Sequence, residues 1–180
     1  MKKYLVFVLA VVLIGALATG ALARGKTGPA GKSNVGHLYL VEKDPVSWEI
    51  VEGGAWGKMK YNLSGSTFDF VFNGHGLEAG VDYCLIYYPD PWPGTDLICL
   101  GSATANGGGN VHIAGSNDTG DLPALTDWNH PDNPNSSDST IEGAKIWLVL
   151  CDDVNSGMTG WNPGEYLFET EGIFFDDTDV

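Results

Sequence analysis

The sequence has few positive charges. Nine Lys and Arg stand against 23 Asp and Glu, which gives a formal net charge of −14. Such a charge repels phosphate backbones, so nucleic acid is not expected as a partner. Charged residues make up only 18% of the chain while aromatic residues make up 11%. This balance is typical of a folded globule rather than of a disordered acidic segment.

Sequence motifs for catalysis and for transition-metal binding are also missing. The four histidines are scattered, neither H-E-x-x-H nor G-x-S-x-G occurs, and no cysteine pair has zinc-finger spacing. The glycines at 107–109 lack the lysine and the helix of a phosphate-binding loop. With so many carboxylates, some pair would fit a glycosidase by chance. The chain is therefore not expected to be an enzyme, and a secreted hydrolase with a carboxylate pair is only an alternative.

One long apolar run is present, near residue 1. Two lysines precede it, the run extends from Tyr4 to about Ala18, and the small residues of Ala21-Leu22-Ala23 follow. This order predicts a signal peptide over residues 1–23, cleaved before Arg24, and a secreted, extracellular protein. If it were not cleaved, the same run could cross a bilayer core of about 30 Å and tether the protein to the outer side of the cytoplasmic membrane.

The rest of the chain is predicted to be a linker and one β domain. Residues 24–36 are rich in Gly, Lys and Ser and predict a flexible linker. Residues 37–180 then hold about nine short segments with strand character, separated by frequent turn signals. Among them are WEIVE at 48–52 and the second half of 76–88, whose aromatic and branched residues predict a fully buried strand. The clearest is the hairpin over 55–73, where apolar residues alternate with polar ones and Phe68, Phe70 and Phe72 share a face. Together they predict an antiparallel β-sandwich.

Two resemblances accompany this pattern. Leu77, Gly80 and Tyr83 form L-x-x-G-x-x-Y before a buried strand, which resembles the tyrosine corner of fibronectin-type and immunoglobulin-like sandwiches, although Ala79 replaces the usual proline. The segments DPVSWEIVEGGAWGKMKY, FDFVFNGHGLEAG, LIYYPDPWPG, NVHIAGSNDTGDLP and GWNPGEYLFE resemble a group of uncharacterised secreted archaeal proteins. That resemblance implies an exported β-rich domain and brings no activity with it.

Three cysteines follow the signal segment in a compartment where disulfides form. Cys84 and Cys99 lie on successive strand-like segments, so this pair is the first to expect. Pairing of Cys84 with Cys151, or three buried thiols, remains open from the sequence.

Candidate ligand sites lie in two loops. The long polar stretch 116–139 offers calcium the oxygen ligands that it prefers, and the candidates are Asp118, Asp121, Asp127 and Asp132. Solvated loop acids are the simpler interpretation. The loop PDPWPG presents Trp92 among prolines, either as a platform for a sugar ring or as a cap on the core. Three sequons are candidate glycosylation sites: Asn62, Asn117 and Asn135.

Function is predicted only as a class. The leading hypothesis is a non-catalytic exported or cell-surface β-sandwich that acts in binding or surface structure, with an envelope protein, a second copy of itself or a polysaccharide as partner. A calcium- or carbohydrate-binding extracellular module is the first alternative. No cofactor other than calcium is expected.

Overall fold

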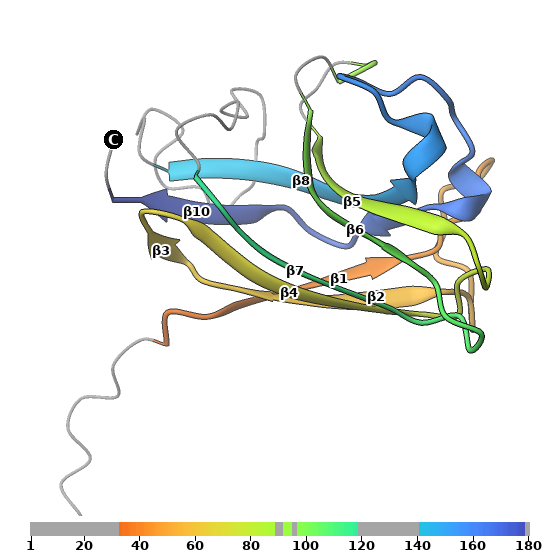
Figure 1. Ribbon diagram of the computed structural model, residues 1–180, viewed down its shortest axis with the longest axis horizontal. Coiled ribbons are helices and arrows are strands. Elements are labelled where there is room, and N and C mark those ends of the chain that lie inside the picture. Colours follow the sequence, from red (N-terminus) through yellow and green to blue (C-terminus); the bar gives the residue numbers. More distant parts are fainter. Residues whose placement is uncertain (1–32, 89–91, 95–96, 119–140, 179–180) are drawn as a thin grey trace, which may run out of the picture. The chain divides into compact units, whose positions relative to one another are not determined.

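The computed structural model describes residues 33–88, 92–94, 97–118 and 141–178, which form an all-β domain (Figure 1). The predicted signal peptide and residues 24–32 of the predicted linker lie outside the described residues. The strands are β1 (Gly36–Val41), β2 (Trp56–Tyr61), β3 (Ser64–Gly65), β4 (Phe68–His75), β5 (Asp82–Tyr88), β6 (Ile98–Thr104), β7 (Val111–Asn117), β8 (Ile141–Leu150), β9 (Leu167–Glu169) and β10 (Ile173–Asp177).

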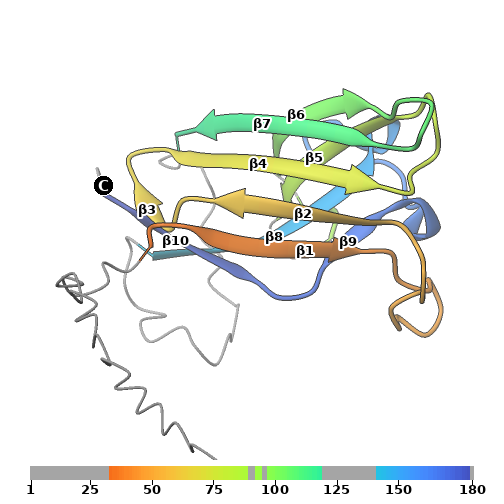
Figure 2. The same ribbon diagram turned by 90° about the horizontal axis from the view of Figure 1, so that it is seen from below.

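Eight of these strands form one antiparallel sheet that is nearly closed like a barrel. Their order is β7-β4-β2-β1-β9-β8-β5-β6. β10 pairs with the first part of β8, and the short β3 pairs with β10 in parallel. Figure 2 shows β1, β2, β4 and β7 side by side, and we call the outward surface of these four strands the open face. β5 and β8 lie across the core from it (Figure 1).

The predicted hairpin is confirmed. β2 and β4 pair antiparallel, with Met59 opposite Phe72. Every second residue of β4 is buried, so Phe68, Phe70 and Phe72 enter the barrel core as the alternation predicted. The predicted strand over 48–52 is wrong, because there the structure has only an isolated bridge between Lys43 and Ile50 within a loop.

β5 is buried on both faces. Tyr83, Leu85 and Tyr87 belong to the barrel core, while Cys84, Ile86 and Tyr88 belong to a second hydrophobic cluster outside the barrel. Residues 151–166 supply Met158 and Tyr166 to this second cluster, and we call this segment the cover. In Figure 1 the cover lies on the side of β5 and β8 that faces away from the open face.

The cover is tied to the barrel by a disulfide between Cys84 and Cys151, while Cys99 is a free, exposed thiol. The predicted pairing of Cys84 with Cys99 is therefore wrong. The ladder between β5 and β6 places Ser102 opposite Cys84 and Ile86 opposite Cys99, so the two sulfurs are not cross-strand neighbours. Cys151 follows directly after β8, whose Val149 is opposite Cys84.

Helix is confined to single turns in the part of the chain that the structure describes. They are 3-10 turns at Cys151–Asp153 and Pro163–Glu165, and neither is long and apolar enough to cross a membrane.

Candidate functional site

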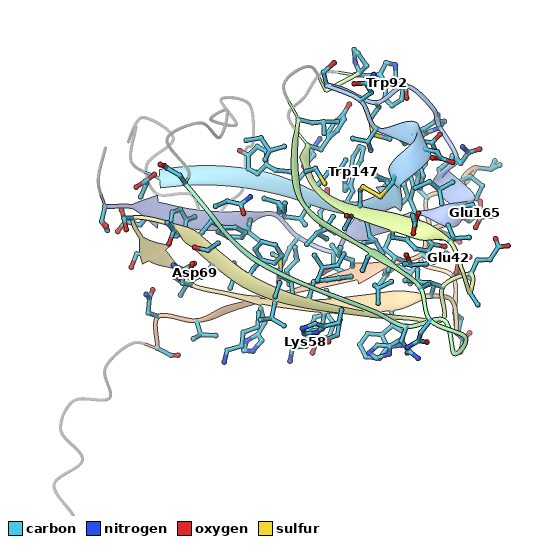
Figure 3. The ribbon with its side chains drawn as sticks, viewed as in Figure 1. Glu42, Lys58, Asp69, Trp92, Trp147 and Glu165 are labelled. Atoms are coloured by element: carbon cyan, nitrogen blue, oxygen red, sulfur yellow. A yellow bond between two sulfur atoms is a disulfide. The ribbon has the colours of Figure 1, made fainter. Side chains whose placement is uncertain are left out.

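A cleft lined by aromatic rings opens between the barrel and the cover. It has a volume of about 470 Å³ and is lined by Tyr88, Trp92, Lys145, Trp147 and Trp161. These residues come from β5, the loop at 92–94, β8 and the cover. Figure 3 shows Trp92 and Trp147 on this side of the molecule, away from Lys58 on the open face.

The floor of the cleft is a stacked pair of rings. Tyr88 and Trp147 lie with ring centroids 4.0 Å apart and planes inclined by 15°. Both are buried, since they stand on the outward surfaces of β5 and β8, which the cover encloses. Offset stacking of this kind adds about 0.5–1.5 kcal/mol to the burial of the rings. The floor is therefore a preformed apolar surface.

The rim of the cleft carries exposed tryptophans. Trp92 is 51% exposed and Trp161 is 43% exposed, and their centroids lie 5.3 Å apart in an edge-to-face arrangement. The backbone carbonyl of Pro93 accepts a 2.8 Å hydrogen bond from the N–H of Met158, which fixes the 92–94 loop to the cover. Gly94 has φ +67° and lies so close to the Tyr88 ring that a side chain would collide with it. The loop thus holds Trp92 beside Trp161.

A third exposed tryptophan adjoins the cleft. Trp48 is 48% exposed, and its ring centroid lies 6.1 Å from that of Trp161 and 5.2 Å from that of Phe168. Its turn is closed by Asp44, whose Oδ1 accepts the N–H groups of Val46 and Ser47 at 2.9 and 2.7 Å; these bonds lower the Asp44 pKa. Trp48 has φ 61°, a left-handed conformation that costs a residue with a side chain about 1–2 kcal/mol. The fold therefore holds this indole at a cost in backbone strain.

The cover is held in shape by a buried carboxylate. Asp153 is 8% exposed and accepts hydrogen bonds from the Tyr166 hydroxyl and, at 2.8 Å, from the Asn162 amide. Its backbone carbonyl accepts the N–H of Thr159 at 2.8 Å. Burial, and then the bond to Asp153, raise the pKa of Tyr166 above its usual range. Because Trp161 adjoins Asn162, this network positions the central ring of the rim.

The charges at the cleft are arranged unevenly. Lys145 is the only charged side chain among the lining residues. Close by, burial raises the pKa of Glu169 to about 7, while a hydrogen bond to its own backbone and the charges of Lys43 and Lys145 act on it in the opposite direction. Trp147 Nε1 and Glu169 Oε2 are buried, and neither makes a well-formed hydrogen bond with any other described group. A carboxyl that ionises near neutral pH therefore lies beside the cleft.

The predicted site residues fall in different places. Trp92 lies on the rim of the cleft. Asp118 is exposed just after β7, whereas Asp121, Asp127 and Asp132 lie outside the described residues, so the calcium prediction stays untested. The Asn62 side chain donates to the carbonyls of Thr67 and Ser64 at 2.8 and 3.3 Å and accepts the N–H of Asp69 at 2.8 Å.

The other two sequons differ in their setting. Asn117 is the last residue of β7, and Asn135 lies outside the described residues. A glycan on Asn62 would have to displace the bonds that its amide donates. Glycosylation stays a prediction at all three positions.

The sequence did not single out the other members of the cleft. Trp147, Tyr88 and Trp48 lie in segments with strand character, where an aromatic residue does not by itself indicate a site. The sequence around Trp161 does point to an exposed site, because GWNPGEY places this tryptophan beside Pro and Gly, as PDPWPG does for Trp92. Two such loops indicate two stiff platforms, but only the fold shows that they converge.

A second, smaller cavity of about 280 Å³ lies at one end of the barrel. Its lining includes Glu42, Glu78 and Glu165, and Figure 3 shows Glu42 and Glu165 at the same end. The Glu42 carboxylate accepts the N–H of Ala55 at 2.8 Å. Among the described residues, no group of three or more His, Cys, Asp and Glu side chains is arranged to hold a metal ion.

Comparisons with protein-family models, with curated proteins and with solved structures found no match.

Proposed function

We propose that this protein is a non-catalytic exported binding domain whose aromatic cleft holds a carbohydrate. The observation that carries the proposal is the convergence of three exposed tryptophans from three separate segments. Trp161 lies between Trp92 and Trp48, with ring centroids 5.3 and 6.1 Å away, above a floor of stacked rings.

A sugar ring fits such a surface because it has an apolar C–H face and a rim of hydroxyl groups. The C–H face stacks on an indole while the hydroxyls stay in water or bond to polar neighbours, as in binding sites that combine aromatic walls with a few polar groups. Three neighbouring indoles offer room for more than one ring, so the expected ligand is an oligosaccharide or a stretch of polysaccharide.

Other ligands with flat or rounded apolar faces fit less well. Aromatic cages bind quaternary ammonium groups, but the Lys145 ammonium in the lining would repel a second cation. Nucleic acid bases also stack on indoles, but the net charge of −14 opposes their phosphates. The lining of the cleft suits binding rather than catalysis, because four aromatic residues and one lysine supply a stacking surface rather than an acid and base pair.

The location outside the cytoplasmic membrane is part of the same proposal. Residues 1–23 have the order of an export signal, and a disulfide joins Cys84 to Cys151. Measuring the N-terminal residue and the thiol count of the protein recovered from a host culture medium tests it. Recovery only from the cytosol, with three free thiols, would contradict export.

We also propose that the barrel is a flattened relative of the immunoglobulin-like sandwich. The N–H of Glu78 donates to the Tyr83 hydroxyl at 3.3 Å, the type of bond that defines a tyrosine corner. Tyr83→Phe removes this bond and should lower the free energy of unfolding by about 1 kcal/mol, measured by chemical denaturation. An unchanged free energy of unfolding would oppose the relation.

Binding to a panel of neutral and acidic oligosaccharides, followed by tryptophan fluorescence and titration calorimetry, tests the function. Trp92→Ala and Trp161→Ala should each weaken binding about tenfold, the loss of about 1.4 kcal/mol of stacking. Trp56→Ala is the matched control, because Trp56 is 45% exposed but lies on the open face. Equal losses in all three variants, or no binding to any member of the panel, would contradict the proposal.

A further inference from the structure

Lys145 occupies a distinctive place in the cleft. It lies on β8 directly opposite Tyr88 in the ladder with β5, next but one to Trp147. It is half-buried and lines the cleft with the four aromatic residues. Its ammonium group therefore borders the surface on which a bound sugar would stack.

The lining of the cleft carries a positive charge, although the molecule as a whole is acidic. The chain has a net charge of −14, and only Lys43, Lys58, Lys60 and Lys145 supply fixed positive charge among the described residues. A charge pair at 4 Å is worth about 1 kcal/mol in water and about 4 kcal/mol at the effective dielectric of a partly enclosed site. One cation at the cleft thus attracts one anionic group, while the surrounding acidic surface disfavours a densely charged polymer.

Lys145 already interacts with the charge of Glu169. An ammonium group has three donors, so Lys145 can keep this neighbour and still bond to a ligand. The Glu169 carboxyl remains largely protonated below about pH 7, because burial opposes its ionisation. In that pH range Glu169 therefore adds little negative charge beside the cleft that would repel a ligand carboxylate.

We infer that the cleft binds a saccharide with one anionic group among neutral rings, and that Lys145 holds that group while the tryptophans stack on the sugar. This inference rests on the proposed carbohydrate function. A lysine ammonium is a point charge that donates hydrogen bonds to a carboxylate or a sulfate. The shared chemistry is a single oxyanion on a sugar, as in a uronic acid or a monosulfated sugar.

The test uses matched oligosaccharides and the full chain. Xylo-, manno- and gluco-oligosaccharides are titrated calorimetrically at pH 6 in three forms: neutral, with one uronic acid, and with one sulfate. We expect an anionic form to bind about tenfold more tightly than its neutral counterpart, with a preference that shrinks as salt is added. The two anionic forms distinguish a carboxylate from a sulfate ligand.

Two variants assign the preference to Lys145. Lys145→Met keeps much of the apolar stem and should bring the anionic-to-neutral ratio to about one. A melting temperature close to that of the wild-type protein shows that the variant is folded. Lys145→Arg should keep the preference. Lys58→Met, on the open face, should leave every affinity unchanged.

Each result decides between the two proposals. Equal binding of neutral and anionic forms by the wild-type protein would overturn this inference and leave the carbohydrate function standing. A preference that survives Lys145→Met would overturn it too. If no oligosaccharide binds at all, the proposed function itself fails.

Discussion

The open face and the covered side of the barrel both expose tryptophan, but in different ways. On the open face, Trp56 points outward from β2 as strand alternation requires, and its ring packs 4.7 Å from that of His75 on β4. On the covered side, Trp92, Trp161 and Trp48 come from loops and meet at one place. A single exposed indole on a strand needs no functional explanation, whereas a convergence of loop indoles does.

The two sides also differ in what supports them. The open face is one layer of strands whose inward side chains fill the barrel core and whose outward side chains meet water. The covered side has a second cluster that depends on the disulfide, the Asp153 network and the cover. Perturbing the cover should therefore affect the cleft far more than changes on the open face.

The disulfide should give the largest effect. Cys84→Ser with Cys151→Ser frees the cover from β5, and removing a native disulfide from a small exported domain costs about 2–5 kcal/mol. We expect a melting temperature lower by at least several degrees and a loss of ligand affinity, measured by calorimetry. Cys99→Ser should change neither, because Cys99 is a free thiol. An unchanged melting temperature in the double variant would show that the cover holds without the bond.

Replacing Asp153 should have the second-largest effect. Asp153→Ala leaves the Tyr166 hydroxyl and the Asn162 amide without their buried acceptor, at a cost of about 2–3 kcal/mol in unfolding free energy. Chemical denaturation measures this loss. Asp152→Ala is the control, because Asp152 is exposed beside it. Equal effects in the two variants would mean that the network does not shape the cover.

Glu169 should make stability depend on pH. Burial raises its pKa from 4.5 to about 7 in the folded protein, so the folded state binds the proton more tightly than the unfolded chain does. Its contribution to stability is therefore highest below about pH 4.5, falls as the pH rises to about 7, and is constant above that. Glu169→Gln should remove this slope and stabilise the protein by about 1–3 kcal/mol at pH 8.

Melts of the wild-type protein and Glu169→Gln from pH 4 to pH 8 measure the effect. Glu171→Gln is the control, because Glu171 is exposed two residues away. Parallel pH profiles in the wild-type protein and Glu169→Gln would contradict the prediction.

The sequence predicted the parts of the fold that depend on local pattern. Alternation assigned the inward faces of β2 and β4, and the aromatic and branched residues of 82–88 indicated a strand buried on both faces. It could not predict which segment covers the outside of β5, because residues 151–166 have no strand or helix period. For the same reason the sequence could not predict the disulfide partner of Cys84, since Cys151 meets Cys84 only when β8 lies beside β5.

The sequence predicted only one of the five residues that line the cleft. Trp92 was singled out from its prolines, but its partners lie 53–69 residues further along or on β5, and only tertiary packing brings them together. Lys145 could not be singled out, because a lysine in a strand gives no sign of which surface it reaches. The strained Trp48 lies in WEIVE, which has strand character in the sequence, but the turn closed by Asp44 determines its conformation.

The smallest effect is expected on the open face. Lys58 lies 5.3 Å from the centroid of the Tyr39 ring, an exposed cation–π contact worth about 0.5–1 kcal/mol at most. Lys58→Met keeps a flexible apolar stem against Tyr39, so the melting temperature should fall by no more than a few degrees. Ligand affinity should not change. A large loss of affinity would mean that the open face takes part in binding, and the functional difference between the two sides would then be wrong.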